Sequence, residues 1–190
     1  MAELLEAAEA VISEIGYEAA TMSAIADRAG AAIGSLYQFF PGKACITQAL
    51  RTEYAKRFDR LFAPLARQAG KLNPETLASR LVDLTVEFAE AHPALPALLE
   101  APKSTRAPLP MQKILRERFA SVLLAQSRRL SKAEAARAGT ATLHILKALN
   151  QLYTEIPGRE RNRMVEEFKM VLLGYFQARL ISERKRRSRQ

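Results

Sequence analysis

A short run of hydrogen-bonding residues in the first quarter of the chain is the part best suited to chemistry. Gly34 and Gln38 are four positions apart, which places them one turn apart on a helix, with Ser35 and Tyr37 beside them. A glutamine amide can pair with N6 and N7 of adenine, and a glycine on the same face lets the helix backbone approach base edges closely. Tyr37 and Lys43 can donate hydrogen bonds to phosphates. These groups therefore suit the recognition of DNA.

The surrounding residues have the order of a helix-turn-helix. Thr21 is a good N-cap for a helix from about Met22 to Ala29, and Gly30 offers the positive φ that a tight turn requires. A second motif helix is expected from Ile33 to Phe39, before Pro41-Gly42 breaks the chain direction. In such a motif the first helix braces the second, which lies in the DNA major groove.

The second motif helix should present two different faces. Leu36 and Phe40 are one turn apart and should pack inward against the preceding helix. Ile33 falls between the inner and outer faces, so it either joins the core or touches a thymine methyl group. The alternative to DNA binding is a set of three small helices packed only for stability, with Tyr37 and Phe39 as core aromatics.

The segment from Ala8 to Leu50 resembles the N-terminal DNA-binding domain of TetR-family transcriptional regulators. In that family Gly-[Tyr/Phe]-x-x-[Ala/Thr]-[Thr/Ser] precedes the first motif helix and Ile-Ala-x-x-Ala-Gly ends it. The first motif helix is followed by the pattern Gly-[Thr/Ser]-Leu-Tyr-x-[Tyr/His/Phe]-Phe-x-x-Lys. The matching residues of this chain are Gly16, Tyr17, Thr21, Ile25, Ala26, Ala29, Gly30, Gly34, Ser35, Leu36, Tyr37, Phe39, Phe40 and Lys43.

The resemblance implies a homodimer that binds a palindromic operator in double-stranded DNA, usually to repress transcription. It also implies a C-terminal helical domain that binds a small-molecule effector and thereby releases the DNA. By the family pattern, the residues that face DNA are Gly34, Ser35, Tyr37 and Gln38, and those that contact phosphate are Thr21, Tyr37 and Lys43.

Two positions depart from the family pattern at the start of the second motif helix. Relatives commonly have Ser or Thr where this chain has Ala32, and often a basic residue where it has Ile33. The first change removes a helix cap worth on the order of 1 kcal/mol, and the second removes a phosphate donor.

The positive charge of the chain lies mostly outside this motif. The 190 residues carry a net charge of +9, but residues 1–45 hold two basic side chains against six acidic ones. Because phosphate neutralisation supplies most non-specific affinity, we expect weak binding to random DNA. This balance motivates a second hypothesis, a helical protein-interaction module that has lost DNA affinity. The main basic cluster lies in a tail, residues 182–190, which we expect to be disordered.

Other classes of protein find little support in the sequence. An enzyme is the third hypothesis, but no nucleophile–base arrangement, phosphate loop or paired acid–base signature is present. His92 and His144 form no cluster with Cys45, so neither a metal nor a cofactor is expected. A single cysteine excludes an internal disulfide and suits a reducing cytoplasm. No apolar run approaches the roughly 18 residues needed to span a bilayer, so no membrane partner is expected.

We expect an all-α protein of about nine helices, because sustained two-residue alternation and hairpin signals are missing. A helix-turn-helix domain over residues 1–45 should precede a larger effector-binding and dimerisation domain over residues 46–181. A first helix carrying Leu4 to Ile15 should end at Gly16. The later helices are expected at Lys43 to Gln68, with Pro64 as a kink or early end, Asn73 to His92, a short helix within 93–110, Met111 to Leu130, Lys132 to Ile156, and Arg159 to Ile181.

The last two long helices carry apolar stripes that could form a four-helix interface around a two-fold axis. The alternative for these stripes is a core within one chain. The residues expected at a dimer interface are Leu143, Leu146, Leu149, Leu152, Phe168, Leu172, Tyr175 and Phe176.

A ligand pocket is expected among the helices between residues 73 and 153, and apolar walls would favour a lipophilic or aromatic effector. Each candidate wall residue has plain core packing as its alternative, and His144 is expected to be a hydrogen-bonded core histidine. The candidates are Phe62, Leu81, Phe88, Leu98, Met111, Phe119 and Leu123.

Overall fold

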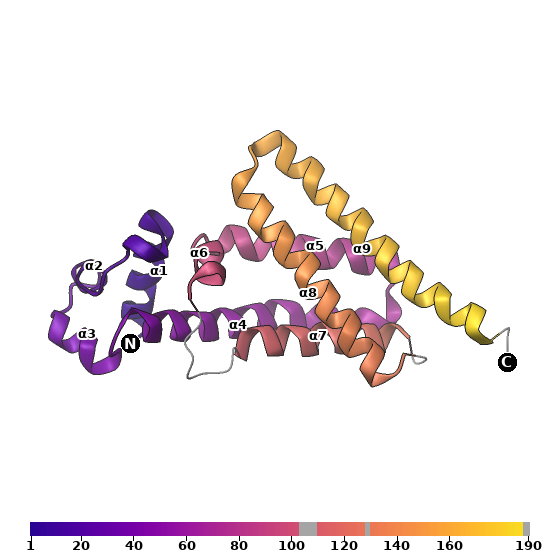
Figure 1. Ribbon diagram of the computed structural model, residues 1–190, viewed down its shortest axis with the longest axis horizontal. Coiled ribbons are helices and arrows are strands. Elements are labelled where there is room, and N and C mark those ends of the chain that lie inside the picture. The colour runs from indigo at the N-terminus through magenta and orange to yellow at the C-terminus, as the bar shows by residue number, and fades with distance from the viewer. Residues whose placement is uncertain (103–109, 128–129, 188–190) are drawn as a thin grey trace. The chain divides into compact units, whose positions relative to one another are not determined.

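The structure, a computed structural model, describes residues 1–102, 110–127 and 130–187. Within these ranges it contains nine α-helices, one short 3-10 turn and no strand, which confirms the expected all-α class. The helices are labelled in Figure 1. Their bounds are α1 Ala2–Ala19, α2 Met22–Arg28, α3 Ile33–Phe39, α4 Lys43–Gln68, η1 Ala69–Lys71, α5 Pro74–Ala91, α6 Leu95–Glu100, α7 Pro110–Gln126, α8 Lys132–Glu155 and α9 Gly158–Arg187.

The chain divides into two compact units. Unit 1 consists of Met1–Arg57 and Glu90–Met111, and unit 2 consists of Phe58–Ala89 and Gln112–Gln190. Unit 1 therefore contains the three N-terminal helices, the first half of α4 and all of α6. It extends further along the chain than the expected boundary at residue 45.

Glycines and one cap define the local structure of the three N-terminal helices. Gly16 interrupts α1 with φ +77° and ψ 167°, at the position where the first helix was predicted to end. The side chain of Thr21 caps α2 by accepting a hydrogen bond of 3.1 Å from the backbone N–H of Ala24, as predicted. Gly30 adopts φ +61° in the turn between α2 and α3, a region that favours glycine. The helix α3 has the bounds that the sequence predicted.

The first three helices and the start of α4 enclose a small hydrophobic core within unit 1. Ile12, Ile25, Leu36 and Ile46 come from four successive helices and are each almost completely buried. Phe40 is buried as well, which confirms that Leu36 and Phe40 form the inner face of the second motif helix. Burial of one side of α3 fixes which of its side chains remain in solvent.

An aromatic cluster lies at the centre of unit 2. The ring centres of Phe62 and Phe119 are 5.3 Å apart and those of Phe58 and Phe88 are 5.1 Å apart, both pairs in edge-to-face geometry. Aromatic pairs of this geometry add to the stabilisation that burial provides. These contacts join α4, α5 and α7.

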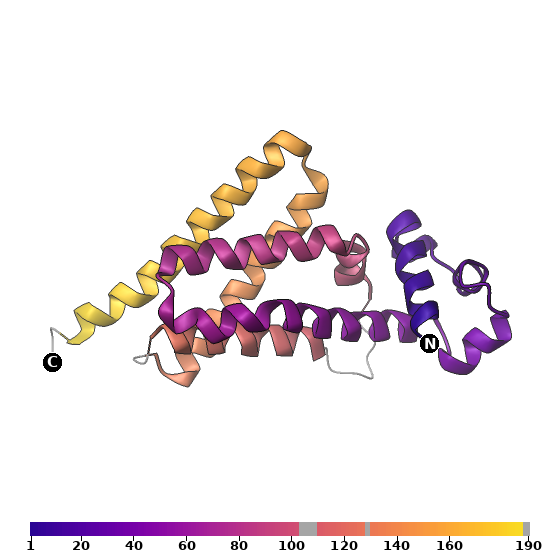
Figure 2. The same cartoon turned by 180° about the vertical axis from the view of Figure 1, so that it is seen from behind.

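In unit 2 the end of α4 agrees with its predicted position, whereas the ends of α7 and α9 differ from theirs. The helix α4 continues through Pro64 and ends at Gln68 as predicted, so this proline does not end it early. The helix α7 ends at Gln126, four residues before the predicted end. After a sharp reversal at Pro157, α9 runs to Arg187 (Figure 2). Residues 182–187 are therefore helical where a disordered tail was expected, and residues 188–190 lie outside the described residues.

Among the described residues, each helix is too short or too polar to cross a bilayer.

Candidate nucleic-acid interface

The outer face of α3 is exposed to solvent. Gly34, Ser35, Tyr37 and Gln38 are all exposed, whereas Leu36 between them is buried. This division agrees with the helical spacing that separated the two faces. The four predicted DNA-facing residues therefore lie together on one accessible surface of unit 1.

Three large side chains on α3 are also exposed. The exposed fractions are 43% for Ile33, 49% for Tyr37 and 54% for Phe39. The alternative that Tyr37 and Phe39 serve as core aromatics is therefore wrong. Ile33 does not join the core either, and its contact with a thymine methyl group stays a prediction.

The start of α3 has no side-chain cap. Ala32 occupies the N-cap with extended backbone and offers no hydrogen-bonding side chain. Its carbonyl oxygen accepts from the N–H groups of Ser35 at 2.9 Å and Leu36 at 3.2 Å, which begins the helix. The tight connection before it is held by a bond of 3.0 Å from the Ala31 N–H to the Ala26 carbonyl. Backbone geometry and packing thus place α3 without the cap that the family pattern usually supplies.

Lys43 is held by the end of α1. Its Nζ donates to the carbonyl oxygens of Tyr17 at 2.7 Å and Glu18 at 3.0 Å, and it lies 4.3 Å from the centre of the Tyr17 ring. An ammonium group has three N–H donors, so one donor remains for a phosphate. At Thr21 the hydroxyl oxygen accepts the capping bond and the hydroxyl hydrogen remains available. The phosphate contacts of both residues stay predictions.

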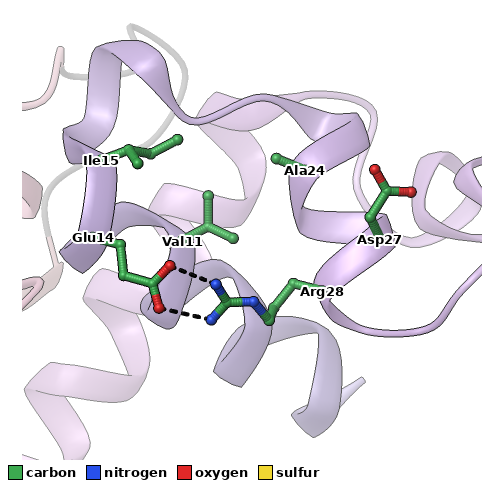
Figure 3. A pocket seen from close by; sticks show the side chains of 6 residues that line it. All are labelled: Val11, Glu14, Ile15, Ala24, Asp27 and Arg28. Carbon is green, nitrogen blue, oxygen red and sulfur yellow. Dashed lines mark hydrogen bonds and ion pairs between the residues drawn. The ribbon is translucent and has the colours of Figure 1, made fainter.

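The basic residue of α2 is paired with a carboxylate. Both guanidinium Nη atoms of Arg28 donate to the carboxylate of Glu14, one of them at 2.8 Å (Figure 3). The hydrogen bond lowers the pKa of Glu14 and raises the pKa of Arg28. The pair borders an open groove of about 450 Å³ between α1 and α2, which is also lined by Val11, Ile15, Ala24 and Asp27. Because its charge is paired with Glu14, Arg28 should add little to attraction toward phosphates, and weak binding to random DNA stays a prediction.

A buried arginine in unit 1 was not anticipated from the sequence. Arg51 on α4 is 4% exposed, and its Nε donates to the Leu98 carbonyl at 2.8 Å. Its Nη atoms donate to the carbonyls of Ala101 and, at 3.3 Å, Pro102. Burial lowers the pKa of Arg51. The guanidinium satisfies carbonyls at the end of α6, where the helix dipole also favours a positive charge.

A second polar cluster in unit 1 is centred on Glu9 of α1. The Tyr54 hydroxyl donates to Oε1 of Glu9 at 2.7 Å, and Nδ1 of His92 lies 3.2 Å from the same oxygen. Arg57 donates to the other carboxylate oxygen at 3.3 Å. Burial and the bond to Glu9 raise the pKa of Tyr54. Residues from α1, α4 and the segment after α5 are thereby joined through one carboxylate.

The predicted pocket residues are buried apolar side chains. Phe62, Leu81, Phe88, Phe119 and Leu123 lie in the interior of unit 2 and Leu98 in that of unit 1. The side chain of Met111 lies outside the described residues. Phe62, Phe88 and Phe119 contact other phenylalanine rings, while Leu123 borders a cavity of about 10 Å³, about the room of one water molecule. Their role in binding a ligand stays a prediction.

Most of the predicted dimer residues already pack within one chain. Leu143, Leu146, Leu149, Leu172 and Phe176 are buried, which corrects the expectation that they face a partner. A heptad-like apolar stripe is the same for an intrachain and an interchain core, so the sequence could not separate the two. Leu152, Phe168 and Tyr175 are partly exposed and remain predictions.

A different surface of α8 and α9 is open. Met170 and Val171 on α9 are 57% and 53% exposed, and Gly174 follows them on the exposed side. On α8, His144 and Ala148 are exposed, one turn apart. The expectation of a buried histidine at His144 was therefore wrong.

The fold and the exposed α3 surface define a helix-turn-helix protein with a helical C-terminal region. Family comparison gives the same result: residues 4–50 match the model of bacterial regulatory proteins of the tetR family. Residues 74–176 match the tetracyclin repressor-like C-terminal domain. The chain therefore belongs to the tetR family of bacterial regulatory proteins, as the sequence resemblance predicted.

Curated relatives match about a third of this chain. The transcriptional repressor KstR of Mycobacterium tuberculosis is 41% identical over 66 residues, which cover 35% of this chain and 29% of that protein. KstR of Rhodococcus jostii is 41% identical over 58 residues, covering 30% of this chain and 26% of that protein. The matched segments thus span less than a third of these relatives.

Solved structures share the fold over almost the whole chain. A TetR-family regulator from Streptomyces coelicolor has a TM-score of 0.72 at 22% identity, covering 93% of this chain and 96% of that chain. FadR from Bacillus subtilis, solved in complex with stearoyl-CoA, has a TM-score of 0.66 at 16% identity, covering 93% and 96%.

Proposed function

We propose that this protein is a DNA-binding transcriptional repressor that binds a palindromic operator as a homodimer and is released by a small molecule. The observation that carries the proposal is the exposed α3 surface with Gly34, Tyr37 and Gln38, within the segment that matches the family model. The protein acts by occupying DNA in the cytoplasm and has no enzymatic activity of its own.

Each polar group at the interface has a proposed role. Gln38 pairs with a base edge, and Gly34 permits close approach of the backbone. Ser35 lies on the same exposed face and is available to either a base or the sugar–phosphate backbone. Thr21, Tyr37 and the third N–H of Lys43 contact phosphates and set the register of α3 in the groove.

Dimerisation gives the protein its control over DNA affinity. Two copies of α3 must lie about 34 Å apart to enter successive major grooves. An effector that binds more tightly to a dimer with another separation lowers operator affinity. The decrease equals the difference in the effector's binding free energy between the two dimer forms, typically about 1–3 kcal/mol. We place the dimer contact on the exposed side of α8 and α9, with Met170, Val171 and Ala148 as its apolar residues.

The effector is proposed to be a largely apolar small molecule. Unit 2 has phenylalanine and leucine side chains in its interior, which suit apolar ligands better than charged ones. FadR from Bacillus subtilis shares the fold and was solved in complex with stearoyl-CoA, whose acyl chain is apolar, and this supports an effector with an apolar part.

Selection of bound DNA from a random pool tests the proposal directly. We expect a two-fold symmetric site with half-sites about one helical turn apart, bound at nanomolar concentration in fluorescence anisotropy and weakened by salt. Repeating the selection with apolar candidate ligands should reveal one that releases the site. No enrichment at low salt would instead favour the protein-interaction module that the acidic N-terminal segment suggests.

A further inference from the structure

The exposed surface of α3 carries no charged side chain. Its exposed residues are Ile33, Gly34, Ser35, Tyr37, Gln38 and Phe39. Guanine is most often read in the major groove by arginine or lysine, which bind O6 and N7 together. The two basic residues nearest in sequence are already engaged, Arg28 by Glu14 and Lys43 by two carbonyls of α1. The surface is therefore poorly equipped to read G·C pairs.

The same surface presents an aliphatic group where apolar contact is possible. Ile33 is the first residue of α3 and is 43% exposed, next to Gly34 and one turn before Tyr37. The thymine C5-methyl is the apolar group that a base pair displays in the major groove. Gln38, which is also exposed and lies about 140° around the helix from Ile33, offers the amide that suits adenine.

We infer that α3 reads A·T pairs, with Ile33 contacting a thymine methyl group and Gln38 pairing with adenine. This inference rests on the proposed function and names the base pairs that the interface selects. It makes Ile33 a specificity-determining residue of this chain, at the position where relatives often carry a basic phosphate donor.

Single-atom changes in the operator test this inference. Once an operator has been selected with the full chain, each thymine is replaced in turn by deoxyuridine, which removes only the C5-methyl group. Each half-site should contain one thymine whose replacement lowers operator affinity about fourfold. This factor corresponds to the free energy of burying one methyl group. The same change in both half-sites should lower the affinity of the dimer about 15-fold.

Variants at two exposed isoleucines assign the effect to α3. Ile33→Ala should bind the thymine and uracil operators equally, whereas Ile15→Ala should discriminate as the unchanged protein does. Ile15 is 50% exposed in the same unit but lies on α1, which makes it a matched control. Thermal melting shows whether each variant is folded, and Ile33→Val provides a milder change at the same position.

The outcomes separate this inference from the proposed function. A tight operator that is insensitive to every uracil replacement, or one that Ile33→Ala still discriminates, overturns the thymine contact and leaves the repressor proposal standing. The inference that α3 reads A·T pairs is also overturned if G·C pairs dominate the selected positions of the half-sites. Failure to select any DNA removes the repressor proposal and this inference together.

Discussion

The ammonium group of Lys43 lies 2.7 Å from the Tyr17 carbonyl oxygen and 4.3 Å from the centre of the Tyr17 ring. Lys43 is the first residue of α4, and Tyr17 directly follows the break in α1 at Gly16. The contact thus joins the end of α1 to the start of α4, and α2 and α3 lie in the chain segment between these two points. It gives Lys43 a structural role beside its proposed contact with phosphate.

Replacing Lys43 with methionine should therefore reduce both stability and DNA affinity. Loss of two charge-assisted hydrogen bonds is expected to lower the free energy of unfolding by about 1–2 kcal/mol. Urea denaturation measures this change, and fluorescence anisotropy measures operator binding. Lys56→Met is the control, because Lys56 is 65% exposed and its ion pair with Glu53 lies at the surface, where such pairs contribute little. Unchanged stability with weakened binding would show that Lys43 serves phosphate alone.

Replacing Arg51 with methionine should destabilise unit 1 strongly. The carbonyls of Leu98 and Ala101 would lose their donor in a buried site, which is expected to cost about 2–3 kcal/mol of unfolding free energy. Arg51→Lys should recover only part of the loss, because a lysine lacks the guanidinium fork. Arg67→Met, at an exposed position on the same helix, should have little effect in the same urea titration. Equal effects at both positions would contradict a capping role for Arg51.

The raised pKa of Tyr54 predicts a loss of stability at alkaline pH. The unfolded chain releases this phenol proton near pH 10, whereas the folded protein keeps it to higher pH because of burial and the bond to Glu9. The contribution of Tyr54 is therefore complete below about pH 10 and is lost as the pH rises above that value. Urea denaturation between pH 8 and about 11 should show a smaller alkaline loss for Tyr54→Phe than for the unchanged protein. Tyr37→Phe, which removes an exposed hydroxyl elsewhere in unit 1, is the control variant.

The close packing of α7 and α8 predicts that a single methyl group is damaging at Gly139. A Cβ atom there would lie 2.7 Å from both the Ala120 nitrogen and the Arg116 carbonyl oxygen, which are backbone atoms of α7. Gly139→Ala should lower the free energy of unfolding by about 1–3 kcal/mol, although alanine is the better helix former by about 1 kcal/mol. Gly158→Ala is the control, since a Cβ at Gly158 meets open space. A stabilised Gly139→Ala protein would show that the two helices separate easily.

Local sequence signals predicted the bounds and faces of α3 well. They could not predict contacts between residues that are far apart in the chain. Gly30 and Pro41-Gly42 delimit α3, and its helical spacing separates Leu36 from Gln38, so bounds and faces both followed from neighbouring residues. Arg51 could not be assigned, because its partners lie 47 to 51 residues away and are carbonyl groups, which every residue carries.

The apolar stripe of α8, which was predicted to face a partner chain, shows a second limit of prediction from sequence. The spacing of Leu143, Leu146 and Leu149 correctly indicates a buried helix face, but hydrophobic burial is not directional. The same stripe serves equally to pack α8 within its own chain or against a partner. Only the three-dimensional arrangement reveals that Met170 and Val171 stay exposed.

Gln38→Ala should change base preference more than it changes total affinity. Removing the amide deletes one bidentate pair, worth about 1–3 kcal/mol of discrimination against the wrong base, and leaves the phosphate contacts in place. Tyr37→Ala is the matched comparison on the same exposed face, and it should weaken binding to all operator variants by a similar factor. Gel shifts on a set of operators that differ at single positions measure both effects. If Gln38→Ala keeps the full preference at every position, the amide does not read a base, and α3 must take its specificity from its apolar side chains or from the shape of the DNA.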